Sequence, residues 1–177
     1  NFEEVCGLLA NLGDAYAVSG NIDRAKHYYE EQRMLAESKG LHAYLGSSYN
    51  GIGFVFVKQG KIKQAIDCYY KALESYRALE NDDKQLELLV GIGLNYRKLE
   101  QWEKALEYFD QAFKVSKYNE NRKEETQIRV DLAEVFIKLD KRDLAISQIE
   151  EAEKDVKYFN TTWSQSLIRR IDSLRNL

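Results

Sequence analysis

The sequence predicts an all-α fold built from helical hairpins that repeat along the chain. The 177 residues contain no proline and are rich in Ala, Leu, Glu, Lys and Gln, a composition that favours long uninterrupted helices. Small residues return every 40 positions, at Gly13, Gly53, Gly93 and Ala133. The apolar residues around them recur three, four and seven positions apart, which is the periodicity of one helix face. Together these observations predict a repeat array, because self-similarity at a fixed period is typical of stacked supersecondary units.

Each repeat is expected to contain two helices. In the first repeat Leu12-Gly13 and Tyr16 belong to the first helix, and Ala25 and Tyr29 belong to the second. The same kinds of residue return in the later repeats, except that Arg129 stands where the pattern requires an apolar side chain. A Gly or Ala in the middle of the apolar face lets the second helix approach closely. We expect helices at residues 3–18, 22–38, 43–58, 62–79, 84–98, 102–118, 122–138 and 142–158.

Short polar turns separate these helices. Gly20 and Gly60 suit the left-handed backbone conformation that commonly ends a helix. Asn21 is expected to be the N-cap of the helix that follows it.

The motif Leu-x-x-Leu-Gly-x-x-Tyr followed by Ala-x-x-x-Tyr resembles the tetratricopeptide repeat, over roughly residues 3–158. The resemblance implies a right-handed α-solenoid of four helix-turn-helix hairpins in one repeat domain over 1–177, with units near 3–40, 43–80, 83–120 and 123–158. The period of 40 exceeds the usual family period of about 34. The proline that commonly closes a family repeat is also missing, and the corresponding positions hold Glu37, Arg77, Lys117 and Lys157.

The two ends of the array are expected to differ. A ninth helix over 161–176 is predicted to begin near Asn160-Thr161-Thr162 and to cap the last repeat with one apolar face. That face carries Leu167, Ile168, Ile171 and Leu174. No such cap precedes the first helix, so we expect a fragment of a longer chain, with self-association through the amino-terminal end as an alternative.

Composition argues against several classes of function. The net charge of −3 and the pI near 5.6 give no electrostatic reason to expect nucleic acid as a partner. No apolar stretch approaches the ~20 residues of a membrane span, and two cysteines without a close-spaced motif suggest a cytoplasmic protein. His27 and His42 lack the companions of a metal site. We therefore predict no cofactor, no metal and no enzymatic activity.

The resemblance implies that the first helix of each hairpin lines a concave groove. One third of a turn from the core stripe, the inward positions of the first repeat are Ala10, Asp14 and Ala17. The candidate partner-binding residues of the later repeats are Asn50, Phe54, Val57, Val90, Leu94, Arg97, Glu134 and Ile137. They form a mostly apolar strip that would suit a peptide or helix of another protein. The alternative is that Phe54 and Leu94 contact neighbouring helices within a tight superhelix.

Three functions follow from this pattern. The leading prediction is a protein–protein interaction scaffold. A second is the peptide-sensing regulatory arm of a bacterial signalling or transcription-control protein, and a third is a structural arm that only self-associates. Binding of chaperone tails through a Lys, Asn and Arg clamp is not expected, because Ala10, Glu87 and Gly91 replace the basic residues of that clamp.

Overall fold

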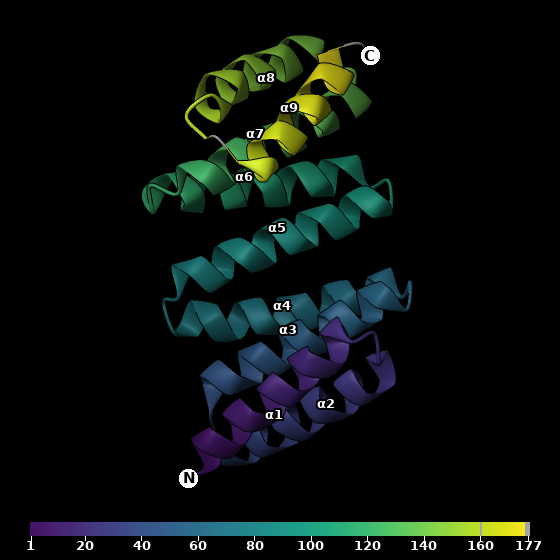
Figure 1. The fold of residues 1–177 in the computed structure, drawn as a ribbon, viewed down its shortest axis with the longest axis vertical. Coiled ribbons are helices and arrows are strands. Elements are labelled where there is room, and N and C mark those ends of the chain that lie inside the picture. The colour runs from purple at the N-terminus through teal and green to yellow at the C-terminus, as the bar shows by residue number, and fades with distance from the viewer. Residues whose placement is uncertain (160, 176–177) are drawn as a thin grey trace. The chain divides into compact units, whose positions relative to one another are not determined.

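The computed structural model describes residues 1–159 and 161–175, and all the regular structure in these ranges is helical (Figure 1). The helices are α1 (Phe2–Val18), α2 (Ile22–Lys39), α3 (His42–Lys58), α4 (Ile62–Ala78), α5 (Asp82–Lys98), α6 (Trp102–Tyr118), α7 (Arg122–Lys138), α8 (Arg142–Val156) and α9 (Thr162–Arg175). Each helix begins 20 residues after the one before it. The prediction of an all-α repeat solenoid is confirmed.

The chain divides into two compact units, which we call unit 1 (Asn1–Asn95) and unit 2 (Tyr96–Leu177). Unit 1 contains the hairpins α1–α2 and α3–α4, with α2 also packed on α3. Unit 2 contains the hairpin α7–α8, with α6 packed on α7 and with α9 against both α7 and α8. Helix α5 contributes residues to both units. The single domain over 1–177 stays a prediction.

The recurring small residues lie where two helices of a hairpin touch. A Cβ atom added to Gly13 would lie 2.4 Å from the ring of Tyr29, and one added to Gly53 would lie 2.5 Å from the ring of Tyr69. Both distances are far below van der Waals contact, so only glycine fits while these rings stay in place. In unit 2, Ala133 is fully buried in one apolar cluster with Ile149.

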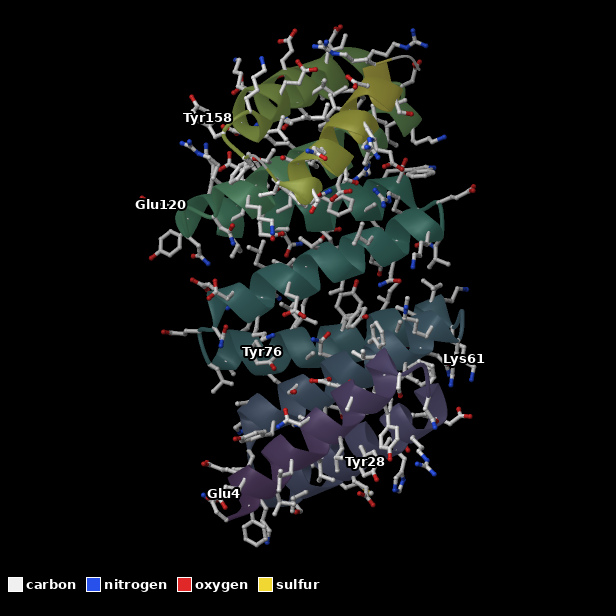
Figure 2. All side chains as sticks on the ribbon, viewed as in Figure 1. Glu4, Tyr28, Lys61, Tyr76, Glu120 and Tyr158 are labelled. Carbon is white, nitrogen blue, oxygen red and sulfur yellow. The ribbon has the colours of Figure 1, made fainter. Side chains whose placement is uncertain are left out.

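The turns repeat as regularly as the helices. The main-chain N–H of Asn21 donates to the carbonyl of Tyr16 at 2.9 Å, and that of Gly20 donates to Ala17 at 3.2 Å, which together form a Schellman motif. Asn21 also caps α2 as predicted, because its side chain accepts from Arg24 N. Every twentieth residue from 20 to 140 has a positive φ angle. Figure 2 shows two residues from these turns, Lys61 between α3 and α4 and Glu120 between α6 and α7.

Arg129, the departure from the repeat pattern, is accommodated by polar and aromatic neighbours. Its Nη2 atom pairs with Glu125 Oε1 at 2.7 Å, and Nη1 donates to Gln148 Oε1 at 3.2 Å. Its guanidinium carbon lies 4.7 Å from the centre of the Phe113 ring, within the range of a cation–π contact. An arginine therefore replaces an apolar residue here without leaving its charge isolated.

The predicted terminal helix caps unit 2. Thr161 and Ser164 exchange hydrogen bonds at its start: Thr161 N donates to Ser164 Oγ at 3.1 Å, and Ser164 N donates to Thr161 Oγ1 at 3.2 Å. Leu167, Ile171 and Leu174 pack with α7 and α8 in one core cluster. Ile168, predicted on the same face, is instead exposed, because it lies next to the buried stripe and not within it. Asn160 and residue 176, at the predicted ends, lie outside the described residues.

Candidate partner groove

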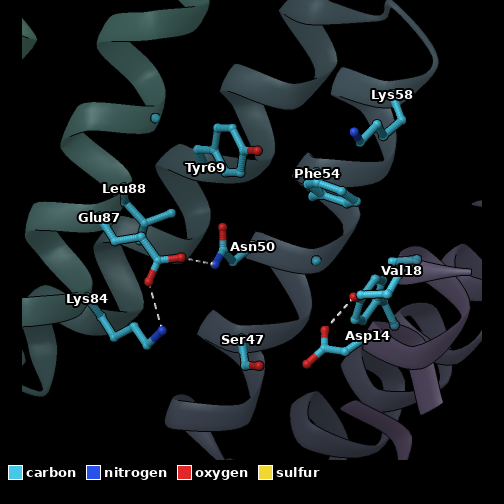
Figure 3. A pocket seen from close by; sticks show the side chains of 14 residues that line it. Asp14, Val18, Ser47, Asn50, Phe54, Lys58, Tyr69, Lys84, Glu87 and Leu88 are labelled. Atoms are coloured by element: carbon cyan, nitrogen blue, oxygen red, sulfur yellow. Dashed lines mark hydrogen bonds and ion pairs between the residues drawn. The ribbon is translucent and has the colours of Figure 1, made fainter. Parts of the chain in front are cut away.

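Unit 1 contains a groove of about 810 Å³ between the first helices of its repeats. Helices α1, α3 and α5 supply most of its walls, and α2 and α4 reach it with one tyrosine each (Figure 3). The lining residues are Asp14, Ala17, Val18, Tyr29, Ser47, Asn50, Gly51, Phe54, Lys58, Tyr69, Lys84, Glu87, Leu88 and Gly91.

Two glycines let the tyrosines of the second helices reach the groove. A Cβ atom at Gly51 would lie 2.6 Å from the ring of Tyr29, so this ring is held between Gly13 and Gly51. A Cβ atom at Gly91 would lie 3.9 Å from Tyr69 Cε2, which is an ordinary van der Waals distance. Gly51 and Gly91 are 40 residues apart, and this second glycine register is the signal that the sequence reasoning missed.

The tyrosines bring phenolic hydroxyl groups into a partly buried site. Tyr29 donates its hydroxyl hydrogen to Asp14 Oδ1 at 2.6 Å. Burial raises the pKa of Tyr29 above its ordinary range, and the hydrogen bond and charge of Asp14 add to this shift. Burial, with a smaller contribution from the charge of Glu87, raises the pKa of Tyr69 to about 12. Both phenols are therefore neutral near pH 7.

A polar network links the first helices of the second and third repeats. Asn50 Nδ2 on α3 donates to Glu87 Oε1 on α5 at 3.1 Å. Lys84 Nζ pairs with Glu87 Oε2 at 2.8 Å, and its hydrogen bond to Glu87 raises the pKa of Lys84. Nearby, Lys58 Nζ lies 5.1 Å from the centre of the Phe54 ring. The groove thus combines aromatic surface with charges of both signs.

The structure brings together part of the set predicted in unit 1. Asn50 and Phe54 line the groove, as do the inward residues Asp14 and Ala17 of the first repeat. Phe54 is 37% exposed, so it is not enclosed by neighbouring helices. The other predicted members of unit 1 are half-buried and lie outside the lining. They are Ala10, Val57, Val90 and Leu94.

The predicted residues of unit 2 are engaged with their own unit. Arg97 Nη1 donates to Asp131 Oδ1 and to Glu134 Oε2, both at 2.9 Å. Arg170 Nη2 on α9 donates to Asp131 Oδ1 at 2.7 Å and also to Glu134 Oε2. Ile137 packs against the core formed by α7, α8 and α9.

Asp131 explains why the inward positions of unit 2 form a closed network. It stands in the register of Gly51 and Gly91, and it is only 1% exposed. The sequence reasoning missed both Asp131 and its partner Arg170. The detectable signal was a carboxylate at a position where two earlier repeats have glycine. The partners of this carboxylate come from α5 and α9, and the repeat spacing does not predict that these residues lie together.

A family model of the tetratricopeptide repeat matches residues 4–78 and 84–155. The chain belongs to the tetratricopeptide repeat family. Its 40-residue period and the absence of proline are therefore variations within that family.

Two curated relatives match this chain over short segments. The chain is 34% identical to response regulator aspartate phosphatase E of Bacillus subtilis over 65 residues, which is 37% of this chain and 17% of that protein. It is 36% identical to outer dynein arm-docking complex subunit 4 of Danio rerio over 74 residues, which is 41% of this chain and 15% of that protein. The matches thus span less than one fifth of these relatives.

A solved structure shares the fold over almost the whole chain. Aspartyl phosphate phosphatase F of Bacillus subtilis superimposes with a TM-score of 0.88 at 17% identity, covering 98% of this chain and 45% of that one. At this identity the likeness concerns the tetratricopeptide-repeat fold alone. The family and the fold support protein–protein interaction as the general class of function.

Two further observations concern membrane spans and metal sites. Among residues 1–159 and 161–175, no helix has the length and apolar character to cross a bilayer. The same residues contain no group of three His, Cys, Asp or Glu side chains placed to hold a metal ion. The predicted cytoplasmic location stays a prediction.

Proposed function

We propose that the groove of unit 1 binds a segment of another polypeptide. The observation that carries the proposal is the aromatic floor: Tyr29 and Tyr69 line the groove next to Gly51 and Gly91, two positions without side chains. A volume of about 810 Å³ falls within the range typical of ligand sites, about 300–1,000 Å³. Such sites combine apolar walls with a few placed polar groups.

The lining matches the needs of a peptide guest. Phe54 and Val18 are exposed and offer apolar contacts for side chains. The carboxylates of Asp14 and Glu87 accept hydrogen bonds, and the neutral hydroxyl of Tyr69 both donates and accepts. Guest main-chain N–H and C=O groups need such partners once they leave water.

The test fills the groove floor without disturbing the helix. A Cβ at Gly91 meets only an ordinary contact, so Gly91→Leu extends a side chain into the groove from a tolerated position. A peptide is first selected from a displayed random library on the wild-type chain, and its Kd is then measured by fluorescence anisotropy. We expect Gly91→Leu to weaken binding by roughly tenfold or more, equivalent to about 1.4 kcal/mol.

Gly7→Ala is the matched control. A Cβ at Gly7 on α1 would have no atom within 4 Å, and Gly7 does not line the groove. The affinity of the Gly7→Ala variant for the selected peptide should equal that of the wild type. An unchanged Kd in Gly91→Leu, with the helical circular dichroism preserved, would contradict the proposal.

A second candidate is a sensing arm within a signalling protein. It is favoured by the similarity to two Bacillus subtilis proteins named as phosphatases of response regulators or aspartyl phosphate. In this role a bound peptide would change the spacing of the hairpins and pass that change to the rest of the protein. Small-angle scattering with and without the selected peptide tests this, and an unchanged radius of gyration would favour the plain scaffold.

We infer that this chain binds its partner without a catalytic step of its own. The groove carboxylates are engaged, since Asp14 accepts from Tyr29, and Glu87 accepts from Asn50 and Lys84. The net charge of −3 also disfavours nucleic acid as the partner. Faster loss of the aspartyl phosphate from a response regulator on addition of this chain would contradict the inference.

A further inference from the structure

The outer face of α1 exposes apolar residues in a single line. Leu8 is 63% and Leu12 is 42% exposed, and Ala15 is exposed as well. Spacings of four and three place these residues on one face of the helix. Phe2 and Val5 add further exposed apolar surface on the same helix.

The equivalent residues of later repeats are buried. Forty residues on, Ser48, Ile52 and Val55 of α3 are all buried. Ile52 and Val55 share a core cluster with Ala25 and Tyr29 of α2, the second helix of the preceding hairpin. The face of α3 that matches the exposed line on α1 is thus covered by a helix.

Unit 2 repeats this arrangement independently. Ile128, Leu132 and Val135 of α7 stand 120 residues after Leu8, Leu12 and Ala15, and all three are buried. Helix α6, the second helix of its hairpin, packs on α7. In both units, therefore, the residues that correspond to Leu8, Leu12 and Ala15 are buried on a helix that packs against the second helix of the preceding hairpin.

Helix α1 has the composition of an enclosed helix but few buried residues. Only Cys6 and Gly13 of α1 are buried, whereas α7 buries eight residues over the same length of 17. A helix that carries apolar residues on several faces is normally packed on several sides. Exposed apolar residues in one patch usually mark an interaction site.

We propose that the face formed by Leu8, Leu12 and Ala15 binds an amphipathic helix from a helical hairpin, seated on α1 as α2 is seated on α3. Continuity with the α2–α3 and α6–α7 interfaces identifies the partner. Its contact face carries small and aromatic residues four positions apart, as Ala25 and Tyr29 do on α2. This surface is separate from the groove, so it goes beyond the function proposed above.

A second copy of the chain fits this surface less well. The second helix at the other end of the array, α8, has its face of Ile149, Ala152 and Val156 covered by α9. A second copy therefore offers no open helix face of the α2 type at that end. Pairing of two α1 faces remains the competing arrangement, and it is an outcome of the test.

The experiment supplies the partner helix in the repeat register. Residues 41–80, which form the hairpin α3–α4, are fused directly before Asn1 of the full chain. The junction keeps the native spacing, because Asn1 caps α1 through Glu3 N at 3.1 Å, as Asn81 caps α5 through Lys84 N at 3.0 Å. Amide hydrogen exchange of α1 is measured with and without the fusion, and we expect it to slow by roughly tenfold or more.

Substitutions separate docking from a general effect of the fusion. Leu8→Glu with Leu12→Glu should abolish the slowing in the fusion, while leaving the melting temperature of the unfused chain nearly unchanged. Ile168→Glu on α9 is the matched control, because Ile168 is a similarly exposed apolar residue in unit 2. It should leave the slowing intact.

Three results would overturn the proposal. The first is an amide exchange rate of α1 that does not change, although circular dichroism shows that the fused hairpin is helical. The second is slowing that survives the double glutamate substitution. The third is a dimer of the unfused chain in light scattering that the same substitution dissociates, which would make a second copy the occupant. If residues 41–80 add no helix, residues 1–40 are fused instead, and failure of both hairpins to pack also counts against the proposal.

Discussion

Gly51 on α3 and Tyr29 on α2 touch so closely that a single added methyl group would lie 2.6 Å from the ring. Gly13 lies against the same ring, because a Cβ atom added there would lie 2.4 Å from it. We therefore expect Gly51→Ala to destabilise the chain by about 1–3 kcal/mol, as overpacking does. Gly91→Ala should do the opposite and stabilise by up to about 1 kcal/mol, because alanine favours the helix. Urea unfolding of the two variants measures both effects, and equal effects would contradict the packing described.

Arg170 should hold α9 in place, whereas its neighbour Arg169 should not. Arg170 pairs with the buried Asp131, and Arg169 is exposed. Removing one partner of a buried pair costs about 3–5 kcal/mol, and Arg97 remains to neutralise part of the charge. We expect Arg170→Met to cost about 2–3 kcal/mol and to speed amide exchange in α9. Arg169→Met is the control, and a similar loss there would exclude a specific role for the pair.

Gln32 on α2 is fully buried, and neither of its side-chain amide atoms has a hydrogen-bond partner within the described part of the chain. The same register holds alanine in the three later repeats. An unsatisfied buried polar group costs about 1–3 kcal/mol. Gln32→Met, which keeps the shape, should therefore raise the free energy of unfolding by about 1 kcal/mol. Gln64→Met at an exposed position on α4 should change little, and a loss of stability in Gln32→Met would show that a partner exists.

Glu100 adopts a left-handed conformation, with φ of 56°, at the turn between α5 and α6. Gly20 and Gly60 occupy equivalent turns at no steric cost, whereas a side chain costs about 1–2 kcal/mol there. Glycine also raises the entropy of the unfolded chain, and this offsets part of the relieved strain. We therefore expect Glu100→Gly to stabilise the folded chain by a net value of about 0.5–1 kcal/mol. Glu103→Gly, three residues later in α6, should instead destabilise by about 1 kcal/mol. Thermal melts of the two variants should shift in opposite directions.

The raised pKa of Tyr69 predicts that the folded chain loses stability at high pH. Its pKa is about 12 in the folded chain, compared with 10 for an ordinary phenol. The phenol of the unfolded chain releases its proton at a lower pH than that of the folded chain. The stabilising contribution of Tyr69 to folding is therefore full below pH 10 and falls as the pH rises from 10 towards 12. The slope reaches at most about 1.4 kcal/mol per pH unit. Urea unfolding across this range should show a shallower decline in Tyr69→Phe than in the wild type, and parallel curves would contradict the burial of this hydroxyl.

The repeat itself was predictable from sequence, because Gly13 and Gly53 must be small wherever a ring of the second helix crosses them. The helix bounds followed from the same register. The groove was harder to predict. Asn50 and Phe54 were found by their position on the helix, but Tyr29 and Tyr69 were assigned to the core, and they line the groove beside Gly51 and Gly91. The charge network around Asp131 joins residues from three helices, and the repeat pattern contains no signal for such contacts.

The ring held between two glycines also has an evolutionary consequence. A change at Gly13, Tyr29 or Gly51 alone would either clash or leave a void, so a change at one of these positions favours a compensating change at another. Between the third and fourth repeats the register of Tyr29 holds the fully buried Phe109 and the register of Gly51 holds Asp131, whereas the register of Gly13 keeps a glycine, Gly93. Related chains should therefore covary at these positions, with a tyrosine retained where glycine leaves its hydroxyl accessible and a ring without a hydroxyl where a larger side chain covers it.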